Sequence, residues 1–563
     1  MKIGRTHSMA FMANQRQQLC LEDSTYSLTE RSQKMLKKSW AENFAQHIFP
    51  LINEDRFSVL YSTNQASRPN TPVNVNIGLL LLKEMFGSTD EELMETVLFD
   101  VRYQYALHTT SFAEQPVSDR TLSRFRERLY IYEQETGIDL MKAEMESLAK
   151  DFVKLLEINP QMKRMDSLMI ASNCKQMSRL EIFYRCVSNM VKAVQATGEM
   201  GLLDSRLLAY LDPEKENNTL YRIDSSQTQS KLEEVCADAV RLWEICADGY
   251  QDIKEYGLLE RVVQEQTQET EHVRSLRSKK EIRTDSLQNP SDEEATFREK
   301  AGKKHRGYVG NVVETFDDKG AIITGMSYKP NIHSDISFCK EVIAEEQTQE
   351  EPVILIADGA YGSDQTQELA KEKNIQLITT ALIGKSPDAI VADYVMDEEQ
   401  HILLRCPAGR SPQSCQYKVT QASYYAHFDK SYCMHCPHRK HCGATFQKKT
   451  VLVRISTKTI RRAEHVRKMS ESQYKKLARQ RNAVEGMPSV LRRRYQVDHM
   501  PVRGYIRTKC MYFLKVGAIN VMRVLKAVSS TPLPALHGRL DSLKISTAAL
   551  FQVRMPREEF VCA

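Results

Sequence analysis

The chain has 563 residues, with 78 Lys and Arg against 73 Asp and Glu, and 41% of its residues are hydrophobic. This composition excludes collagen-like, low-complexity and wholly disordered chains. The apolar runs are too short to cross a bilayer, and residues 1–18 lack the apolar core of a secretory signal. An odd number of cysteines, 13, argues against a disulfide framework. We therefore expect a soluble cytoplasmic protein with no membrane partner.

The charge is distributed unevenly along the chain. Residues 451–530 carry 19 Lys and Arg against only four acids, while the remainder of the chain is net acidic. Tyrosines and a phenylalanine are interleaved with this basic segment, as a polyanion-binding face requires. The plainer alternative is a solvated helical face, but the excess is too one-sided for pairing within helices. The segment therefore favours nucleic acid as a partner.

Residues 1–60 are polar and irregular in pattern, and we infer little from them. The apolar run 75–86 predicts a helix that ends at Gly87, since glycine commonly follows a helix C-terminus. Ser88, with Glu91 three residues later, predicts a capping box that opens the next helix.

A third helix is expected after Ser118 or Thr121, and it carries Arg124 and Arg126. A helical region over 61–150 with a basic last helix suggests DNA contact. A small helical bundle without DNA contact would give the same pattern, and both interpretations stay open.

A strand is expected within 151–173, with Asp166 in its middle, and it is followed by a charged helical insertion over 174–300. The end of that insertion, 262–300, is acidic, Gln-rich and poor in apolar residues, which predicts an exposed helix or linker.

Over residues 301–385 the spacing of the apolar residues changes from that of helices to that of strands. A hairpin over 306–326 is followed by a helix near 334–346 and by two short apolar runs, 352–357 and 375–380. Runs of this kind are typical of strands buried on both faces. The alternation predicts a mixed α/β sheet with helices on both faces.

Three acidic residues are candidates for chemistry. Asp358 directly follows a buried strand, where α/β folds place ligands, although Asp-Gly is also a common turn. Asp166 lies mid-strand, where aspartate is disfavoured and needs a partner or a metal. Glu485 is expected on a helix, where it either pairs with Arg481 four residues earlier or completes a site with the aspartates.

Three carboxylates of this kind could hold two Mg²⁺ ions, because Mg²⁺ prefers oxygen ligands. Two such ions activate the attacking oxygen and stabilise the leaving oxygen of a phosphoryl transfer. We therefore expect the carboxyl groups of Asp166, Asp358 and Glu485 to lie within about 8 Å of one another.

The residues resemble the DDE transposases of bacterial insertion sequences. Arg481-x3-Glu485-x6-Arg492 is similar to the Tyr-x2-Arg-x3-Glu-x6-Lys signature of one group, with Ala478 at the tyrosine position and arginine in place of the final lysine. The runs around Asp166 and Asp358 are similar to the two aspartate motifs of the family. Each motif alone is weak, but their order along one chain is specific.

The resemblance implies an RNase H-like catalytic core, cleavage at element ends and strand transfer into target DNA. Asp166, Asp358 and Glu485 would be catalytic and would bind Mg²⁺ or Mn²⁺. It also implies double-stranded DNA as partner, a homodimer in a synaptic complex and association with the nucleoid. The DNA-binding candidates are Arg481, Arg492, Arg493, Arg494, Arg124 and Arg126.

Five cysteines crowd into a Cys-rich insertion over 386–450. Cys433-x2-Cys436-x5-Cys442, with Cys406 upstream, suits closed tetrahedral Zn²⁺ ligation. Cys415 is a spare, and the alternative ligands are His435, His438 and His441. Buried reduced thiols and a redox pair are the plainer alternatives. After this insertion we expect a basic helical segment over 451–530, which carries Glu485, and then a C-terminal tail over 531–563.

Three other interpretations remain. An inactive, domesticated relative would keep the fold and the carboxylates. A non-enzymatic, zinc-containing DNA-binding regulator would tolerate the loss of Asp166, Asp358 or Glu485. A thiol redox protein is disfavoured, because the cysteines lack a βαβ context.

Overall fold

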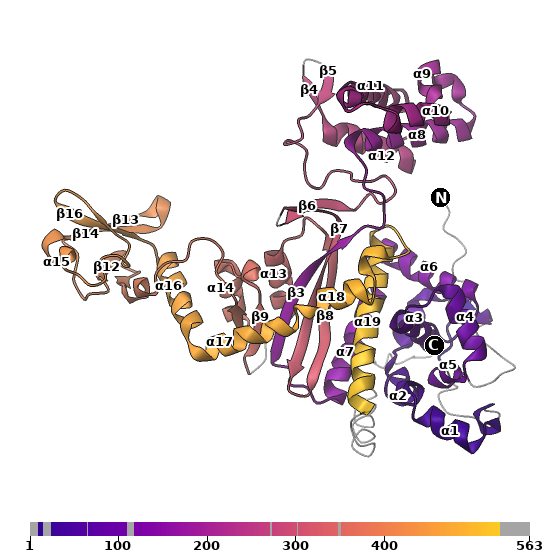
Figure 1. Cartoon of the computed structure of the whole chain (residues 1–563), viewed down its shortest axis with the longest axis horizontal. Coiled ribbons are helices and arrows are strands. Elements are labelled where there is room, and N and C mark those ends of the chain that lie inside the picture. Colours follow the sequence, from indigo (N-terminus) through magenta and orange to yellow (C-terminus); the bar gives the residue numbers. More distant parts are fainter. Residues whose placement is uncertain are drawn as a thin grey trace, which may run out of the picture.

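The computed structural model describes residues 9–14, 24–64, 66–109, 117–270, 273–300, 302–346 and 351–529. The C-terminal tail expected over 531–563 lies outside these residues. A central sheet is flanked by the N-terminal helices, while a helical insertion and a small β-rich module project from it in different directions (Figure 1). None of the helices among the described residues has the length and apolar character needed to span a bilayer.

Much of the polar segment 1–60, from which the sequence predicts little, is helical. Residues 24–60 contain two helices, and Phe44, Phe49 and Phe57 are almost completely buried there. The apolar residues in this segment are few but large, so composition underestimates the surface that they bury. The helices of the N-terminal region are α1 (Glu30–Lys37), α2 (Trp40–His47), α3 (Val73–Phe86), α4 (Asp90–Phe99), α5 (Val101–Ala106), α6 (Asp119–Thr136) and α7 (Leu140–Leu155).

The predicted helix ends are correct in one case and shifted in another. Helix α3 ends at Gly87, whose φ of 71° is the left-handed conformation that glycine adopts readily. The capping box of α4 uses Thr89 and Glu92 instead of Ser88 and Glu91, with N–H···O distances of 2.7 and 3.1 Å. Both pairs fit the sequence pattern, so the register was ambiguous by one residue.

The central sheet has the strand order β10-β9-β3-β7-β6, and β8 pairs with β7. The β3–β7, β7–β8 and β6–β7 pairs are antiparallel, whereas β3–β9 and β9–β10 are parallel. The predicted mixed α/β architecture is therefore confirmed. Its strands are β3 (Met162–Ala171), β6 (Thr296–Lys300), β7 (Lys303–Asp317), β8 (Gly320–Pro330), β9 (Val353–Ala357) and β10 (Ile375–Thr379).

Helices cover both faces of this sheet. Val312 on β7 packs with the α7 and α19 (Tyr505–Ser529) side, whereas its neighbour Val313 packs toward α13 (Asp335–Glu345) and α14 (Asp364–Glu372). This alternation follows from the two-residue period of a strand. The expectation of helices on both faces holds for the described residues.

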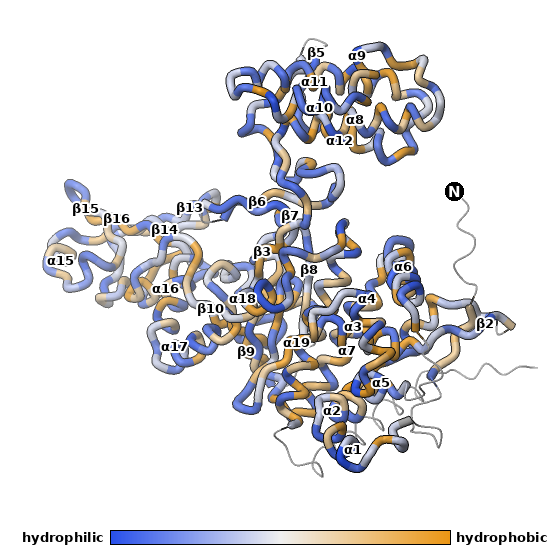
Figure 2. The backbone as a smooth tube through the Cα atoms, turned by 45° about the vertical axis from the view of Figure 1, so that its right-hand side comes forward, coloured by the Kyte–Doolittle hydropathy of each residue, from blue (hydrophilic) through white to orange (hydrophobic). Residues whose placement is uncertain are grey.

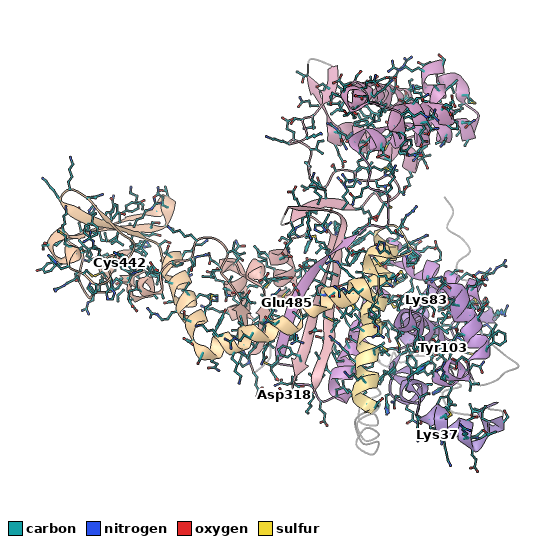
Figure 3. All side chains as sticks on the ribbon, in the orientation of Figure 1. Lys37, Lys83, Tyr103, Asp318, Cys442 and Glu485 are labelled. Atoms are coloured by element: carbon teal, nitrogen blue, oxygen red, sulfur yellow. The ribbon has the colours of Figure 1, made fainter. Side chains whose placement is uncertain are left out.

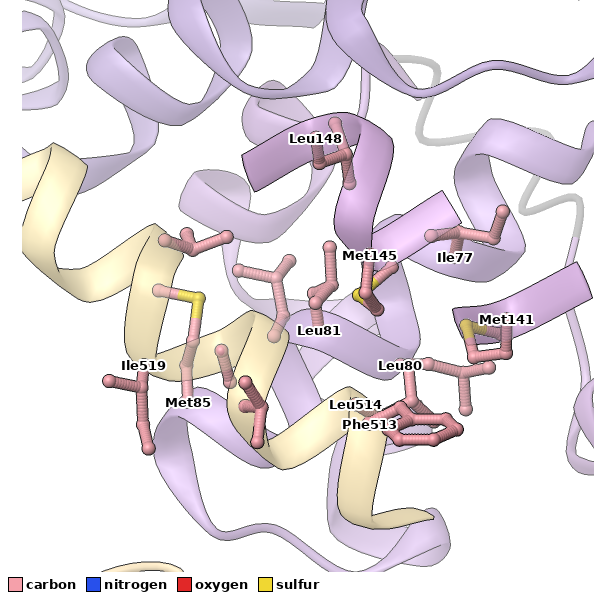
Figure 4. Packing of buried hydrophobic residues seen from close by; sticks show 14 of the residues in the cluster. Ile77, Leu80, Leu81, Met85, Met141, Met145, Leu148, Phe513, Leu514 and Ile519 are labelled. Carbon is pink, nitrogen blue, oxygen red and sulfur yellow. The ribbon is translucent and has the colours of Figure 1, made fainter. Parts of the chain in front are cut away.

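Helix α19 joins the N-terminal helices and the sheet into one hydrophobic core. Leu81 of α3, Met145 of α7 and Leu514 of α19 belong to one buried cluster (Figure 4). Hydrophobic segments gather where these three helices meet (Figure 2). Nearly every residue of α3 is buried, including the polar Asn74, Asn76, Lys83 and Glu84, which fits its mostly apolar sequence. The 61–150 region thus shares its core with the sheet.

The predicted helical insertion lies between β3 and β6 and has its own core. The expectation of an exposed helix or linker over 262–300 is wrong, because Leu287 and Asp292 are buried and β6 joins the central sheet. The insertion contains α8 (Arg179–Thr197), α9 (Ser205–Leu208), α10 (Pro213–Glu216), α11 (Thr228–Ile245), α12 (Lys254–Gln266), β4 (Thr267–Thr270) and β5 (Val273–Leu276).

The Cys-rich region forms a separate antiparallel sheet of order β13-β14-β16-β15, beside a β11–β12 pair. Helices α16 and α17 connect it back to the central sheet (Figure 1). Its elements are β11 (Val395–Asp397), β12 (Ile402–Arg405), β13 (Ser414–Lys418), β14 (Ser423–Asp429), α15 (Lys430–Met434), β15 (Ala444–Phe446) and β16 (Thr450–Ile455). They are followed by α16 (Thr457–Ser470), α17 (Ser472–Arg479) and α18 (Gly486–Arg493).

Candidate active site

Asp166 and Asp358 are brought together by the pairing of their strands. Asp166 lies within β3, opposite Val312 of β7, and its side chain is only 15% exposed. Asp358 directly follows β9, which runs parallel to β3. Its Oδ1 accepts hydrogen bonds from the N–H of Gly359 (2.7 Å) and from Oγ1 of Thr380 (2.8 Å). Asp358 therefore makes the turn contact expected of Asp-Gly and still keeps Oδ2 for another partner.

Glu485 does not lie inside a regular helix, contrary to expectation. A 3-10 turn, Gln480–Ala483, precedes it, and α18 begins at Gly486. Pro488 sits in the first turn of α18, where its missing N–H costs no hydrogen bond, but it cannot continue a helix from upstream. The break leaves the Glu485 side chain 52% exposed at the start of α18.

One guanidinium contacts all three carboxylates. Nη2 of Arg481 lies 3.4 Å from Oδ1 of Asp166 and 4.0 Å from Oδ2 of Asp358, while Nη1 lies 2.5 Å from Oε1 of Glu485. The two aspartate oxygens have one nitrogen as a common neighbour, although the described residues include no group of three or more His, Cys, Asp or Glu side chains placed to hold a metal ion. The three acidic side chains thus lie around Arg481, and their joint role in metal binding stays a prediction. Figure 3 shows Glu485 over the sheet.

The pKa values of the two aspartates are shifted in opposite directions from their usual values. Burial raises the pKa of Asp166, and the charge of Asp358 raises it further, against the lowering effect of Arg481 and the Ser167 N–H. Burial also acts to raise the pKa of Asp358, but the Thr380 hydrogen bond, Arg481 and the Gly359 N–H together hold it below its usual value. The two pKa values diverge mainly because burial dominates at Asp166, whereas hydrogen bonds and nearby cations outweigh burial at Asp358.

A buried ion-pair network fixes the Glu485 segment to the sheet. Glu314 of β7 is fully buried between Arg164 (2.8 Å) and Arg523 (2.6 Å). Arg164 also donates from Nη1 to the carbonyl of Gln480 at 3.1 Å, next to Arg481. The position of the third carboxylate thus depends on charges inside the core.

The arginines expected to bind DNA divide into two groups. Arg481 lies among the carboxylates, Arg126 pairs with Asp90, and Arg492 contacts Asp498 (3.1 Å) and the carbonyl of Met169 (2.7 Å). These three hold elements of the chain together in this structure. Arg124, Arg493 and Arg494 are exposed, and so is Arg492 despite its two contacts.

Sequence patterns missed a second set of polar groups beside Asp166 and Asp358. Ser167 donates from Oγ to Oδ1 of buried Asp335 at 2.8 Å, and Lys300 lies 3.4 Å from the other oxygen of Asp335. Lys300 opens the β6–β7 turn, where Lys303 and Lys304 are exposed. The basic run 298–306 was the available signal, but the boundary placed at residue 300 divided it between the expected linker and the expected α/β core.

Four of the five clustered cysteines line one small cavity of about 30 Å³: Cys406, Cys433, Cys436 and Cys442. Cys415 lies on β13 instead, where its Sγ accepts from the N–H of Leu403 at 3.4 Å. Of the histidines, only His438 reaches the cavity, while His441 faces Asp388 at 3.4 Å. Within the described ranges, no group of three or more His, Cys, Asp or Glu side chains forms a ready metal site.

Two family models match the chain. Residues 405–525, which include Glu485 and the four cysteines of the cavity, match the model described as "Transposase DDE domain". Residues 33–128 match "Transposase domain (DUF772)". No curated protein and no solved structure matches the chain. Both family matches support a DDE transposase of the insertion-sequence type, which confirms the family that the order of the sequence motifs predicts.

Proposed function

We propose that this chain is a metal-dependent transposase that cuts DNA at the ends of a mobile element and joins them to target DNA. Asp166, Asp358 and Glu485 are the proposed ligands of Mg²⁺ or Mn²⁺. The observation that carries the proposal is the gathering of these carboxylates, from segments far apart in sequence, around the guanidinium of Arg481. Three carboxylates that surround the guanidinium of Arg481 supply the negative charge and the oxygen donors that these metals require.

The strand order supports an RNase H-like core, which the family resemblance implies. Three antiparallel strands, β3, β7 and β8, are extended on the β3 side by the parallel strands β9 and β10. Asp166 belongs to the first of these strands and Asp358 follows the fourth in chain order, β9. Two ions bound there would activate the attacking oxygen and stabilise the leaving oxygen of the phosphoryl transfer.

The protein residues around the site have complementary tasks in this proposal. Asp335, through Ser167, and the network around Glu314 keep the carboxylates in position. Arg481 gives up the carboxylates when metal ions bind, and its fork of donors then suits a phosphate oxygen. Lys303 and Lys304, with the exposed arginines Arg493 and Arg494, would hold the DNA backbone.

Joining two element ends requires two active sites near each other. We therefore propose that a homodimer, or a larger assembly, brings the two ends together on DNA.

An inactive relative that still binds DNA is the second candidate. The contacts of Arg481 favour it, because a guanidinium that stays among the carboxylates would exclude metal ions. The two candidates make opposite predictions for metal binding and cleavage.

The test is a cleavage and strand-transfer assay on DNA that carries the gene with its native flanks, with Mg²⁺ or Mn²⁺. Active protein should release the element ends, and Asp166→Asn, Asp358→Asn and Glu485→Gln should each lower the rate by at least about a thousandfold with DNA binding retained. Asp318→Asn, at the far β7–β8 turn (Figure 3), is the matched control and should leave the rate unchanged. Cleavage that survives the three substitutions would overturn the assignment of the site.

A further inference from the structure

The outer end of the Cys-rich module lacks a hydrophobic core of its own. The inner end is held by a buried cluster that includes Leu403, Tyr424 and Val453. In contrast, no side chain of residues 430–449 is fully buried, although this stretch contains α15, several turns and β15. A segment that buries so little needs a covalent or metal crosslink to hold one conformation.

Four thiols from three separate places converge at this outer end. Cys406 follows β12, Cys433 and Cys436 belong to α15 and the turn after it, and Cys442 precedes β15. All four line the same cavity of about 30 Å³, together with apolar groups such as Phe428.

The backbone around these cysteines is already folded into tight turns. The carbonyl of Cys406 accepts from the N–H of Gly409 at 2.7 Å, and Gly409 has a φ of +75° that favours glycine. The N–H of Cys436 donates to the carbonyl of Cys433 at 3.4 Å, and the N–H of Cys442 donates to His438 at 2.9 Å. Among the described residues these thiols do not yet form a ready metal site, so closure on a common ion requires them to move toward one another.

We propose that Cys406, Cys433, Cys436 and Cys442 form a structural Zn²⁺ site that holds residues 430–449 in one conformation. Four thiolates at about 2.3 Å from the ion would give the closed tetrahedral ligation of a structural site, with no open position for catalysis. Binding releases the thiol protons to solvent as the thiolates form. The inference does not depend on the activity proposed for the carboxylates.

The charge of this end indicates what the zinc site would support. No acidic residue occurs between Asp429 and Glu464, and the stretch includes the exposed cations Arg439, Lys440 and Lys448. The module projects away from the central sheet, with Cys442 near its far end (Figure 3). A rigid basic tip at that distance can contact DNA phosphates beyond those held at the carboxylates.

The test measures the metal content of the full chain purified under reducing conditions without chelator. One zinc per chain is expected, and Cys433→Ser and Cys436→Ser should each lose it. Cys415→Ser, in the same module but outside the cavity, is the matched control and should keep its zinc. Replacement of zinc by Co²⁺ should give the strong tetrahedral and thiolate-to-metal absorption bands, which a merely adsorbed ion does not give.

A second readout follows the tip directly. Trypsin should cut slowly at Arg439 and Lys440 in the zinc-loaded protein and about tenfold faster after chelation or in Cys433→Ser, while circular dichroism of the whole chain changes little. The proposal is overturned if neither the purified nor the zinc-reconstituted protein holds the metal. It is also overturned if mass spectrometry finds the four cysteines joined as disulfides in the native protein, or if Cys433→Ser retains zinc.

Discussion

Arg481 donates a hydrogen bond from Nη2 to Oδ1 of Asp166 at 3.4 Å, across 315 positions of the sequence. This contact joins the break before α18 to the middle of β3. It places a fixed positive charge where the proposed mechanism needs metal ions, so the guanidinium and the metal compete for the same carboxylates.

Replacing Arg481 by Gln should strengthen metal binding. The substitution removes the competing charge and leaves three carboxylates facing one another. We expect Mg²⁺ to bind about tenfold more tightly, which corresponds to about 1.4 kcal/mol, and to raise the melting temperature more than in the native chain. Titration calorimetry and thermal unfolding with and without Mg²⁺ measure both effects. Arg493→Gln, on the exposed side of α18, is the control, and equal Mg²⁺ affinity in the two variants would contradict the competition.

The pH dependence of stability should reveal the environment of Asp166. Its pKa is raised in the folded chain, so the folded state holds the proton more tightly than the unfolded state does. In the absence of metal, this contribution favours folding at low pH and is lost as the pH rises through the folded pKa. Asp166→Asn should therefore gain stability relative to the native chain as the pH rises through that range. Urea unfolding at several pH values measures the difference, and a difference that does not change with pH would refute the expectation.

The affinity for Mg²⁺ should rise with pH, whereas the contribution of Asp166 to stability should fall. Because the metal requires ionised ligands, its affinity should fall as the pH decreases, with Asp166 protonated before Asp358, whose pKa is lowered. Calorimetric titrations of Mg²⁺ across the acid range should show release of a proton as the ion binds. The same titration of Arg493→Gln is the control and should show the pH dependence of the native chain, and an affinity that does not change with pH would contradict the expectation.

Truncation of Glu314 should destabilise the fold strongly. Glu314→Ala leaves Arg164 and Arg523 without their shared buried partner. Loss of one member of a buried network of this kind costs about 3–5 kcal/mol, which denaturant titration can measure. Glu314→Gln keeps the shape and one acceptor, so it should cost less. Asp318→Asn, at the exposed β7–β8 turn, should have almost no effect, and an equally small effect of Glu314→Ala would disprove the role of the network.

The β6–β7 turn should contribute to DNA affinity through phosphate contacts. Replacing Lys303 and Lys304 by Ala should weaken binding at low salt and lower the slope of log affinity against log salt by about 1 for each lost contact. Fluorescence anisotropy on a duplex at several salt concentrations gives this slope. The matched control replaces Lys34 and Lys38, which lie on or directly after α1. An unchanged slope in the turn variant would exclude these lysines from the DNA contact.

Local patterns predicted a large part of the fold. The apolar run that became β9 and the run that became β10 fitted buried strands because their residues pack on both sides. The sequence patterns gave no useful or a wrong prediction where segments of polar composition became buried. Residues 24–60 became helical and buried through a few aromatic side chains, and residues 262–300 were held by the central sheet and by buried polar groups such as Asp292.

The sequence by itself determined which residue types were available: three carboxylates in family order, four cysteines at zinc spacing and an excess of basic residues near the C-terminus. The four-residue spacing already offered the Arg481–Glu485 pair, which the structure contains, but only the tertiary structure decided the other partners. It turned Arg481 toward the carboxylates, tied Arg492 to Asp498, and moved Glu485 out of a regular helix. The reason is physical: a charge takes the partner that lowers its free energy in the folded chain, and that partner is set by burial and distance, which spacing along the sequence does not encode.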